Sequence, residues 1–421
     1  MAADPAEMPL DGEPPAFAVR SLGCRVNQYE SRALAGALAG AGWRETDAAA
    51  ASHVIVNVCA VTEKGSRKAR RLVRFLCRAA PRRRVYVMGC ATAHDRAAYL
   101  ALPQVRAVVP PPARDAMARI IAGCAGGDAL RSFGARTRAY VKIQDGCSRA
   151  CTYCIVPLLR GPSRSRPAGD VAAECRALLA GGAPEIWIAG THLDEWAGGL
   201  PALLDSIGPL FDGVSARARL GSIGIEALTE PLLAAAARHA GICRHFHISL
   251  QSGSARIRRR MGRRCGPDEI RARIARCREA LPGATFTGDI LVGFPGEEEE
   301  DFAATAALCR EIGFVKMHVF PFSPRPGTPA AGFSGRPAAA ETASRCARLA
   351  ALERELFALQ AGALVGRTLA VVVERAGAAA EGFSEEYVRV RFAPGAVRKG
   401  AIARVRAADL RPGFLWGEIV A

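Results

Sequence analysis

The stretch Tyr140-Val-Lys-Ile-Gln-Asp-Gly-Cys147-Ser-Arg-Ala-Cys151-Thr-Tyr-Cys154 is a short apolar strand that runs into a loop with three closely spaced cysteines. The C-x3-C-x2-C spacing lets one loop wrap a metal cluster. Structural zinc usually has a fourth ligand nearby, whereas the next cysteine, Cys175, lies in an expected helix over residues 174–180. Three thiolates on a four-iron cluster leave one iron open to a substrate. A zinc knuckle or a set of redox thiols is the alternative interpretation.

This motif after a strand resembles the signature of radical S-adenosylmethionine enzymes. In that family the open iron binds the amino and carboxylate groups of the cofactor's methionine, and one electron from the cluster cleaves the cofactor to a 5′-deoxyadenosyl radical. The resemblance implies that Cys147, Cys151 and Cys154 hold a [4Fe-4S] cluster and that S-adenosyl-L-methionine is the cofactor.

Upstream of this loop, short strands alternate with helices, which predicts a doubly wound parallel sheet. Strands are expected over residues 17–24, 53–59, 84–90 and 105–109, with helices over 29–41 and 64–78. Cys24, Cys59 and Cys90 each fall just past the carboxyl end of a strand, which is the sheet edge where ligands bind. The pattern therefore predicts a second three-thiolate site. Three buried cysteines acting as small apolar residues are the alternative.

The residues around these cysteines resemble the amino-terminal domain of the methylthiotransferases. The matching segments are Gly23-Cys-Arg-Val-Asn-Gln-Tyr-Glu30, Asn57-Val-Cys-Ala-Val-Thr62 and Met88-Gly-Cys-Ala91. In that family three such cysteines hold a second four-iron cluster. The first segment, together with Lys142-Ile-Gln-Asp-Gly-Cys147, is most similar to the branch that acts on threonylcarbamoyladenosine in tRNA.

Six further strands are expected over residues 141–143, 185–189, 218–223, 245–250, 285–292 and 315–320. Six are too few for a closed eight-stranded barrel and suit the open partial (βα)6 barrel that the resemblance implies. Active sites of such barrels lie at the carboxyl ends of the strands. The resemblance places cofactor contacts there, among Gly190, Thr191, Gln251 and Ser252.

The chain departs from the family pattern at two places. After Leu220-Gly-Ser-Ile223 the family usually has a Glu-Pro pair, whereas this chain has Gly224-Ile225, with Glu226 only later. The role of the family glutamate is therefore open here, or it has moved to Glu226. Leu158 replaces an aromatic residue that is usual after the cysteine triplet, while Arg160-Gly161 and Arg164-Ser-Arg166 are kept.

The chain has 421 residues and 50% hydrophobic residues, which predicts two to three globular domains. Lys and Arg number 57 against 40 Asp and Glu, and the resulting net charge of +17 favours a polyanionic partner. No apolar run is long enough to span a membrane, and the first fifteen residues lack a secretory leader, so we expect a cytoplasmic protein. Fourteen cysteines in a reducing compartment indicate metal or redox chemistry.

Two arginine clusters favour a phosphate backbone as partner, although either alone is equally well a solvated face. Arg67, Arg71, Arg74 and Arg78 recur at helical spacing, and the second cluster comprises Arg256, Arg258, Arg259, Arg260, Arg263 and Arg264.

The end of the chain changes from a helix over 338–360 to period-two strands over 368–374, 387–392 and 401–406, which predicts a small antiparallel barrel. Gly382-Phe-Ser-Glu-Glu-Tyr-Val388 resembles the TRAM module that ends this family. One face of the barrel is expected to present arginines to RNA, namely Arg389, Arg391, Arg404 and Arg406.

The predicted organisation is a disordered tail over residues 1–15, a methylthiotransferase amino-terminal domain over 16–125, a radical SAM core over 134–361 and a TRAM domain over 362–421. The other eight cysteines are expected to be packing residues: Cys77, Cys124, Cys175, Cys243, Cys265, Cys277, Cys309 and Cys346.

The resemblance implies transfer of a methylthio group to carbon 2 of N6-threonylcarbamoyladenosine at position 37 of tRNA, immediately 3′ of the anticodon. It implies two [4Fe-4S] clusters, S-adenosyl-L-methionine as methyl donor and radical source, an electron donor such as flavodoxin or ferredoxin, and a sulfur donor. The second cluster would carry or donate the sulfur. One alternative is a sister enzyme acting on N6-isopentenyladenosine of tRNA or on a ribosomal protein. The other is a non-catalytic RNA-binding protein with iron–sulfur clusters.

Overall fold

The computed structural model describes residues 14–126, 130, 133–134, 136–393, 395 and 397–420. Most of the tail expected over residues 1–15 lies outside the described residues. The chain forms two compact units. Unit 1 comprises Met1–Ser132 with Leu158–Gly161, and unit 2 comprises Phe133–Pro157 with Pro162–Ala421. None of the described helices is long and apolar enough to cross a membrane.

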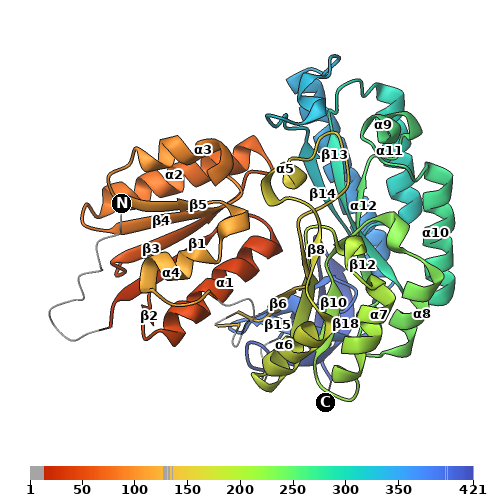
Figure 1. Ribbon diagram of the computed structural model, residues 1–421. Helices are drawn as coiled ribbons and strands as arrows, with labels where there is room; N and C mark the ends of the chain where they lie inside the picture. Colours follow the sequence, from red (N-terminus) through yellow and green to blue (C-terminus); the bar gives the residue numbers. More distant parts are fainter. Residues whose placement is uncertain are drawn as a thin grey trace. The chain divides into compact units, whose positions relative to one another are not determined.

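Unit 1 is built on the predicted parallel sheet, whose strand order is β2-β1-β3-β4-β5 (Figure 1). Its strands are β1 (Ala16–Ser21), β2 (Arg44–Glu45), β3 (His53–Val58), β4 (Arg84–Gly89) and β5 (Val105–Val109). Its helices are α1 (Arg25–Gly40), α2 (Glu63–Ala79), α3 (Thr92–Leu100) and α4 (Ala116–Ala122). Strand β3 is buried at every position because helices cover both faces of the sheet. The doubly wound architecture is confirmed, and the two-residue strand β2 was not predicted.

Unit 2 contains the predicted open barrel of parallel strands. They are β6 (Ala139–Lys142), β9 (Glu185–Ala189), β10 (Arg217–Leu220), β11 (Ser222–Ile223), β12 (His245–Gln251), β13 (Thr285–Val292) and β14 (Lys316–Pro321). The segment predicted as one strand over 218–223 is divided at Gly221 into β10 and β11. There the Gly221 N–H donates to the Ile188 carbonyl at 2.8 Å, and a Cβ at Gly221 would lie 2.6 Å from the same oxygen.

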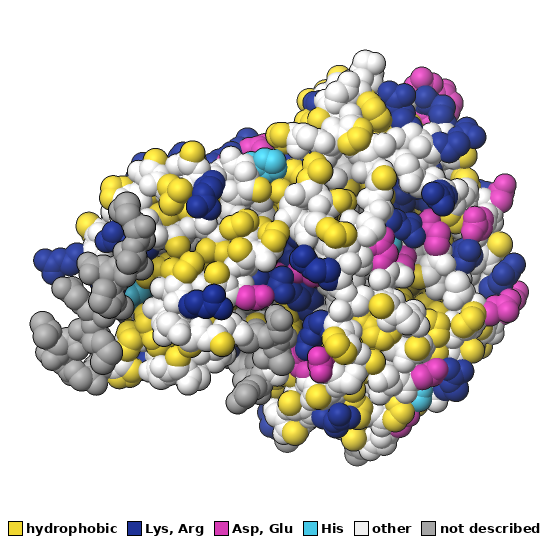
Figure 2. Space-filling model, viewed as in Figure 1, with side chains coloured by type: hydrophobic (Ala, Val, Ile, Leu, Met, Phe, Trp, Pro, Cys, Tyr) yellow, Lys and Arg dark blue, Asp and Glu magenta, His cyan; other side chains and the backbone are white. Residues whose placement is uncertain are grey.

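Helices surround the outside of this barrel (Figure 1). They are α6 (Ala168–Ala180), α7 (Gly199–Ile207), α8 (Glu230–Arg238), α9 (Ala255–Arg260), α10 (Pro267–Ala280), α11 (Glu299–Ile312) and α12 (Ala339–Gly362). Basic and acidic side chains interleave on the visible face of unit 2 (Figure 2), and α10 shows the pattern through the ion pairs Arg271–Glu311 and Arg273–Glu269. Much of the positive charge of these helices is thus neutralised locally.

The carboxyl-terminal segment closes into a five-stranded barrel in the order β15-β16-β17-β19-β18. The strands are β15 (Thr368–Arg375), β16 (Ala380–Phe383), β17 (Arg389–Phe392), β18 (Ile402–Arg411) and β19 (Phe414–Ile419). The antiparallel prediction is wrong for one pair, because β17 and β19 run parallel. A closed ring with an odd number of strands cannot alternate direction throughout, so one parallel pair is unavoidable.

A buried ionic network joins the two barrels of unit 2. Glu185 of β9 accepts from Arg217 at 2.5 Å and from Arg219 at 3.0 Å. Arg217 also donates to the Phe383 carbonyl at 3.0 Å, and Arg219 donates to the Ser384 carbonyl at 3.2 Å. Burial opposes ionisation of Glu185, but these arginines outweigh it and hold its pKa well below the ordinary value. The network fixes the small barrel against the amino-terminal ends of the large one.

Candidate functional site

The loop that carries Cys147, Cys151 and Cys154 is anchored at its start by Gln144. The Gln144 Oε1 atom accepts from the backbone N–H groups of Thr191 and His192, both at 2.9 Å. Its Nε2 atom donates to the Gly146 carbonyl at 2.6 Å. These bonds tie the start of the loop to the carboxyl end of β9. The approach is so close that a Cβ at Gly190 would lie 2.7 Å from Leu193 Cδ2 and 3.1 Å from Gln144 Oε1.

The end of the loop is held by Thr152. Its N–H donates to the Met261 carbonyl at 3.0 Å, its hydroxyl donates to the Arg260 carbonyl at 3.0 Å, and its own carbonyl accepts from Ala330 N–H at 2.9 Å. Burial raises the pKa of Cys154 to about 12 and also raises that of Cys147, and the neighbouring thiolates of the triplet add to both shifts. The ionised forms of Cys147 and Cys154 therefore need a compensating positive charge.

Charged side chains surround this loop. Arg149 Nη1 lies 3.4 Å from Glu226 Oε1, and Arg149 Nη2 lies 3.8 Å from Asp194 Oδ2. Arg263 Nη1 lies 4.0 Å from Cys151 Sγ. Burial raises the pKa of Asp194 to about 7, although its carboxylate accepts from the Gly224 N–H at 3.0 and 3.2 Å. The mixture of charges suits a zwitterionic ligand beside the thiols.

Glu226 occupies the space left by the family departure at Gly224. A Cβ at Gly224 would lie 2.5 Å from Asp194 Oδ2 and 2.6 Å from Glu226 Oε2. The Glu226 carboxylate therefore fills the place into which a side chain at position 224 would point. Burial opposes its ionisation, but backbone N–H donation, Arg149 and Arg263 outweigh this and lower its pKa. Besides its backbone N–H donor and Arg149, whose Nη1 lies 3.4 Å from Oε1, the carboxylate keeps acceptor capacity for a ligand donor.

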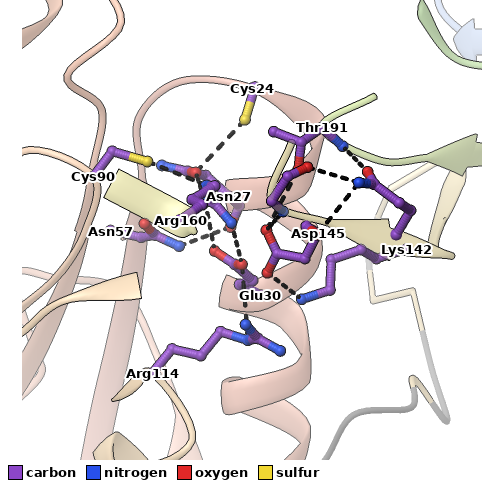
Figure 3. A network of polar contacts seen from close by, with 12 residues as sticks. Cys24, Asn27, Glu30, Asn57, Cys90, Arg114, Lys142, Asp145, Arg160 and Thr191 are labelled. Atoms are coloured by element: carbon purple, nitrogen blue, oxygen red, sulfur yellow. Dashed lines mark hydrogen bonds and ion pairs between the residues drawn. The ribbon is translucent and has the colours of Figure 1, made fainter. Parts of the chain in front are cut away.

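The four predicted cofactor contacts lie at the ends of β9 and β12. Thr191 Oγ1 lies 3.4 Å from Asp145 Oδ1 (Figure 3). Gln251 has a left-handed backbone, with φ of +69°, where the register between β12 and β13 shifts. The Ser252 hydroxyl is buried and bonded to Thr305 at 3.2 Å, so it is already used inside the protein. The contacts at Gly190, Thr191, Gln251 and Ser252 stay predictions.

The sheet of unit 1 brings its three predicted cysteines to one edge. Cys24 directly precedes α1, Cys59 follows β3 and Cys90 follows β4, and the strands β1, β3 and β4 are neighbours. Gly23 has φ of +106°, and a Cβ there would lie 2.6 Å from Cys59 Cβ and 2.9 Å from Cys59 Sγ. Burial raises the pKa of Cys90 to about 12, and the nearby Cys24 and Cys59 thiolates raise it further while Arg160 lowers it.

Arg160 is the central partner of Cys90 (Figure 3). Its Nε atom lies 3.3 Å from Cys90 Sγ, its Nη1 atom donates to Glu30 at 2.8 Å, and its Nη2 atom donates to Asn27 Oδ1 at 2.9 Å. Asn27 in turn donates to the Val58 carbonyl at 3.2 Å. Arg160, Glu30 and Asn27 are all buried. Sequence reasoning noted that Arg160 is kept but missed this network. Leu158, two residues earlier, is 61% exposed.

The thiols of each cysteine set lie near one another. They are close enough to influence one another's pKa. Within the described part of the chain, no group of three His, Cys, Asp or Glu side chains converges tightly enough to hold one metal ion. The two sets of cluster ligands stay predictions.

The first arginine cluster is exposed as predicted. Arg67, Arg71, Arg74 and Arg78 are all exposed on α2, beside Phe75, which is 66% exposed. Arg70, on another side of the helix, is instead paired with Glu63 at 2.7 Å and Asp95 at 3.0 Å. The four arginines form no ion pair with the described residues, which leaves their charge available to a partner.

The prediction for the second cluster is wrong for its buried members. Arg258 donates to the carbonyls of Cys265 and Leu250, both at 2.6 Å, and is 1% exposed. Arg263 is also buried, and Arg256 is paired with Asp301. These side chains brace the loop after β12, because buried backbone carbonyls need donors.

The remaining cysteines are confirmed as packing residues for the most part. All are free thiols. Cys77, Cys175, Cys243, Cys265, Cys277 and Cys309 are buried, whereas Cys124 and Cys346 are half-buried.

In the small barrel, β17 and β18 alternate buried apolar residues with outward arginines. Arg389 and Arg391 both pair with Glu381, at 3.3 and 2.6 Å.

Comparison with known proteins assigns both units. Residues 141–309 match the family model of the radical SAM superfamily, and residues 16–110 match that of the uncharacterized protein family UPF0004. A threonylcarbamoyladenosine tRNA methylthiotransferase MtaB of Chlamydia pneumoniae is 33% identical, covering 96% of this chain and 98% of the relative. A tRNA-2-methylthio-N(6)-dimethylallyladenosine synthase of Frankia casuarinae is 36% identical, covering 85% of this chain and 71% of the relative.

Solved structures support the fold. The radical S-adenosylmethionine methyltransferase TsrM of Kitasatospora setae superposes with a TM-score of 0.57 at 14% identity, over 75% of each chain. At this identity the likeness concerns the fold, and it agrees with the predicted partial barrel.

Proposed function

We propose that this chain, which belongs to the family of tRNA methylthiotransferases, adds a methylthio group to carbon 2 of N6-threonylcarbamoyladenosine, immediately 3′ of the anticodon. The observation that carries the substrate assignment is similarity over whole chains. Relatives named for threonylcarbamoyladenosine are covered over 98% and 95% of their length in Chlamydia pneumoniae and Bacillus subtilis. We propose a cytoplasmic location, which a tRNA substrate supports.

A radical SAM enzyme uses S-adenosyl-L-methionine and an iron–sulfur cluster. In our proposal Cys147, Cys151 and Cys154 hold that cluster, and Cys24, Cys59 and Cys90 hold a second one. When bound, these groups supply a radical for the unactivated C–H bond, a sulfur atom and a methyl group. The protein holds these thiols in place. Gln144 and Thr152 anchor the loop that carries Cys147, Cys151 and Cys154. Gly23 lets the segment before Cys24 pack closely against Cys59.

The cofactor is proposed to lie between the carboxyl ends of β9 and β12 and the charged side chains beside the loop that carries Cys147, Cys151 and Cys154. These side chains are Arg149, Asp194, Glu226 and Arg263. Gly190 and Thr191 follow the carboxyl end of β9, Gln251 ends β12 and offers an amide, and Ser252 follows β12. The Glu226 carboxylate is proposed to accept a hydrogen bond from the ammonium group or from the ribose hydroxyls of the cofactor, because it lies beside Arg149 of the cysteine loop and keeps acceptor capacity.

Replacing Glu226 tests this placement. Glu226→Gln keeps the volume and removes the charge, and we expect about tenfold weaker binding of S-adenosyl-L-methionine because a charge-assisted hydrogen bond is lost. Equilibrium dialysis of the reconstituted protein measures the affinity, and iron content should not change. Glu230→Gln, exposed on α8, is the matched control. Equal affinities of the two variants would remove Glu226 from the cofactor site.

The exposed face of α2 is proposed to contact the tRNA backbone. Arg71→Ala/Arg74→Ala should lower tRNA affinity and reduce the slope of log affinity against log salt by about 2, because two phosphate contacts disappear. Filter binding at several salt concentrations measures both. Arg176→Ala, exposed on α6, is the charge control. A slope equal to that of the wild type would mean that α2 does not face the RNA.

The sister reaction on N6-isopentenyladenosine is the second candidate, favoured by relatives of 35% and 36% identity. The discriminating experiment incubates the reconstituted enzyme with tRNA carrying either nucleoside. Flavodoxin or ferredoxin is the proposed electron donor, and a separate sulfur donor is supplied. We expect the methylthio product only from the threonylcarbamoyl nucleoside. Product only from the isopentenyl nucleoside would establish the sister enzyme, and no cofactor cleavage at all would favour a non-catalytic RNA-binding protein.

A further inference from the structure

Unit 2 contains a cavity of about 750 Å³ where the small barrel meets the edge of the large one. Its walls come from the start of β14, from α12 and from the small barrel. Lys316 and His318 line it and belong to the first half of β14. Because the barrel strands are parallel, this half lies at the end opposite to the cysteine loop, which follows the carboxyl end of β6. The cavity is therefore distinct from the candidate cofactor site.

The interior of the cavity is largely apolar and is shaped by a strained tyrosine. Phe357, Leu410 and Pro412 contribute apolar surface. Tyr387 has φ of +65°, which is unusual for a bulky residue. Its ring stacks on His245 of the large barrel at 4.8 Å and on Phe383 at 5.0 Å. Strain of this kind persists where the surroundings hold a side chain in a required place.

Basic side chains line the cavity, namely Lys316, Arg354, Arg389 and Arg411. Arg389 is paired with Glu381 at 3.3 Å, and Arg411 is paired with Asp409 at 2.6 Å. Glu353 is paired with Lys316 at 2.5 Å. Arg354 is exposed and forms no ion pair with the residues that the structure describes. Apolar walls with cations at the rim are complementary to a flat molecule that bears a negative group.

We propose that this cavity binds a nucleotide, with the base against the apolar walls and the phosphate at Arg354. The volume lies in the usual range for small-molecule sites. β14 alone spans about 20 Å, so the modified adenosine cannot occupy both ends of the barrel at once. The occupant is another nucleotide of the same tRNA, because bases of RNA loops are readily turned outward into protein pockets. This inference rests on the proposed function for its source of nucleotide.

Filling the cavity tests the inference without removing any existing contact. Ala358 lines the cavity on α12 and is exposed, so Ala358→Trp blocks the space. Ala351→Trp, seven residues earlier on the same helix and also exposed, is the matched control outside the cavity. Arg354→Ala removes the unpaired rim charge, with Arg176→Ala as its control. The probes are a labelled anticodon stem-loop RNA and AMP, measured by fluorescence anisotropy and equilibrium dialysis on the full chain.

We expect Ala358→Trp and Arg354→Ala each to weaken stem-loop binding about tenfold, which is typical for loss of one base contact, while both controls match the wild type. Loss of AMP binding with RNA affinity unchanged would overturn the assignment to a nucleotide of the tRNA, and would identify a free nucleotide as the ligand. Unchanged binding of both probes would overturn the inference. Methylthiolation by the wild-type protein is measured in the same preparations. An inactive wild type would count against the proposed function alone, since AMP binding tests the cavity independently.

Discussion

Cys59→Ala is expected to stop methylthio transfer while cleavage of S-adenosyl-L-methionine continues, whereas Cys151→Ala abolishes both. The reason is that Cys59 and Cys151 belong to different sets of thiols, one at the sheet edge of unit 1 and one in the loop of unit 2. Each variant should retain about half the iron of the wild type, since each would lose one of the two proposed clusters. The measurements are 5′-deoxyadenosine formation, methylthio nucleoside formation and iron content.

Cys346→Ala is the control for this pair, because Cys346 is a half-buried thiol on α12 outside both sets. It should match the wild type in all three measurements. Equal loss of cofactor cleavage in Cys59→Ala and Cys151→Ala would contradict the assignment of separate roles. Iron content separates that result from general misfolding, because a misfolded chain loses both clusters.

Arg160→Met is expected to destabilise unit 1 by about 3–5 kcal/mol, because it leaves the buried Glu30 carboxylate without its main partner. Arg114 lies 3.8 Å from Glu30 and compensates only in part. Denaturant unfolding of the cluster-free protein measures the loss. Glu30→Met/Arg160→Met removes both charges and should recover most of the stability. If Arg160→Met were as stable as the wild type, the network around Glu30 would contribute little to the free energy of unfolding.

A different substitution at this position, Arg160→Lys, should change the proposed second cluster, because Arg160 donates toward Cys90 Sγ at 3.3 Å. Hydrogen bonds to cluster sulfur tune the reduction potential. In Arg160→Lys, which keeps a positive charge, the midpoint potential of the second cluster should fall and that of the first should stay constant. Electron paramagnetic resonance during redox titration follows each cluster. Equal potentials in variant and wild type would limit Arg160 to a structural role.

The sequence predicted the positions of the cysteines well because their placement follows from local patterns. Strands such as His53–Val58 are continuous apolar runs, and parallel strands bring their carboxyl ends to one edge. Two strands of the small barrel were missed. Gly382 in β16 and Gly417 in β19 interrupt the apolar alternation, and each packs too closely against a neighbouring strand for a side chain.

Long-range partners could not be predicted from one sequence. Arg160 and Cys90 are 70 residues apart, and no periodicity connects them. Burial of Arg258 was likewise hidden, because an arginine-rich segment has the same composition whether its side chains face water or backbone carbonyls. Gly224 and Glu226 show the opposite case: a departure from the family pattern was visible in the sequence, and the structure supplied its steric explanation.

The most direct test of the central claim is mass spectrometry of the tRNA nucleosides from cells with and without this gene. Our account predicts that 2-methylthio-N6-threonylcarbamoyladenosine disappears on deletion, with accumulation of the unmodified threonylcarbamoyl nucleoside. It should return with the wild-type gene and not with Cys59→Ala. Loss of the methylthio-isopentenyl nucleoside instead, or no change in any tRNA nucleoside, would contradict the account.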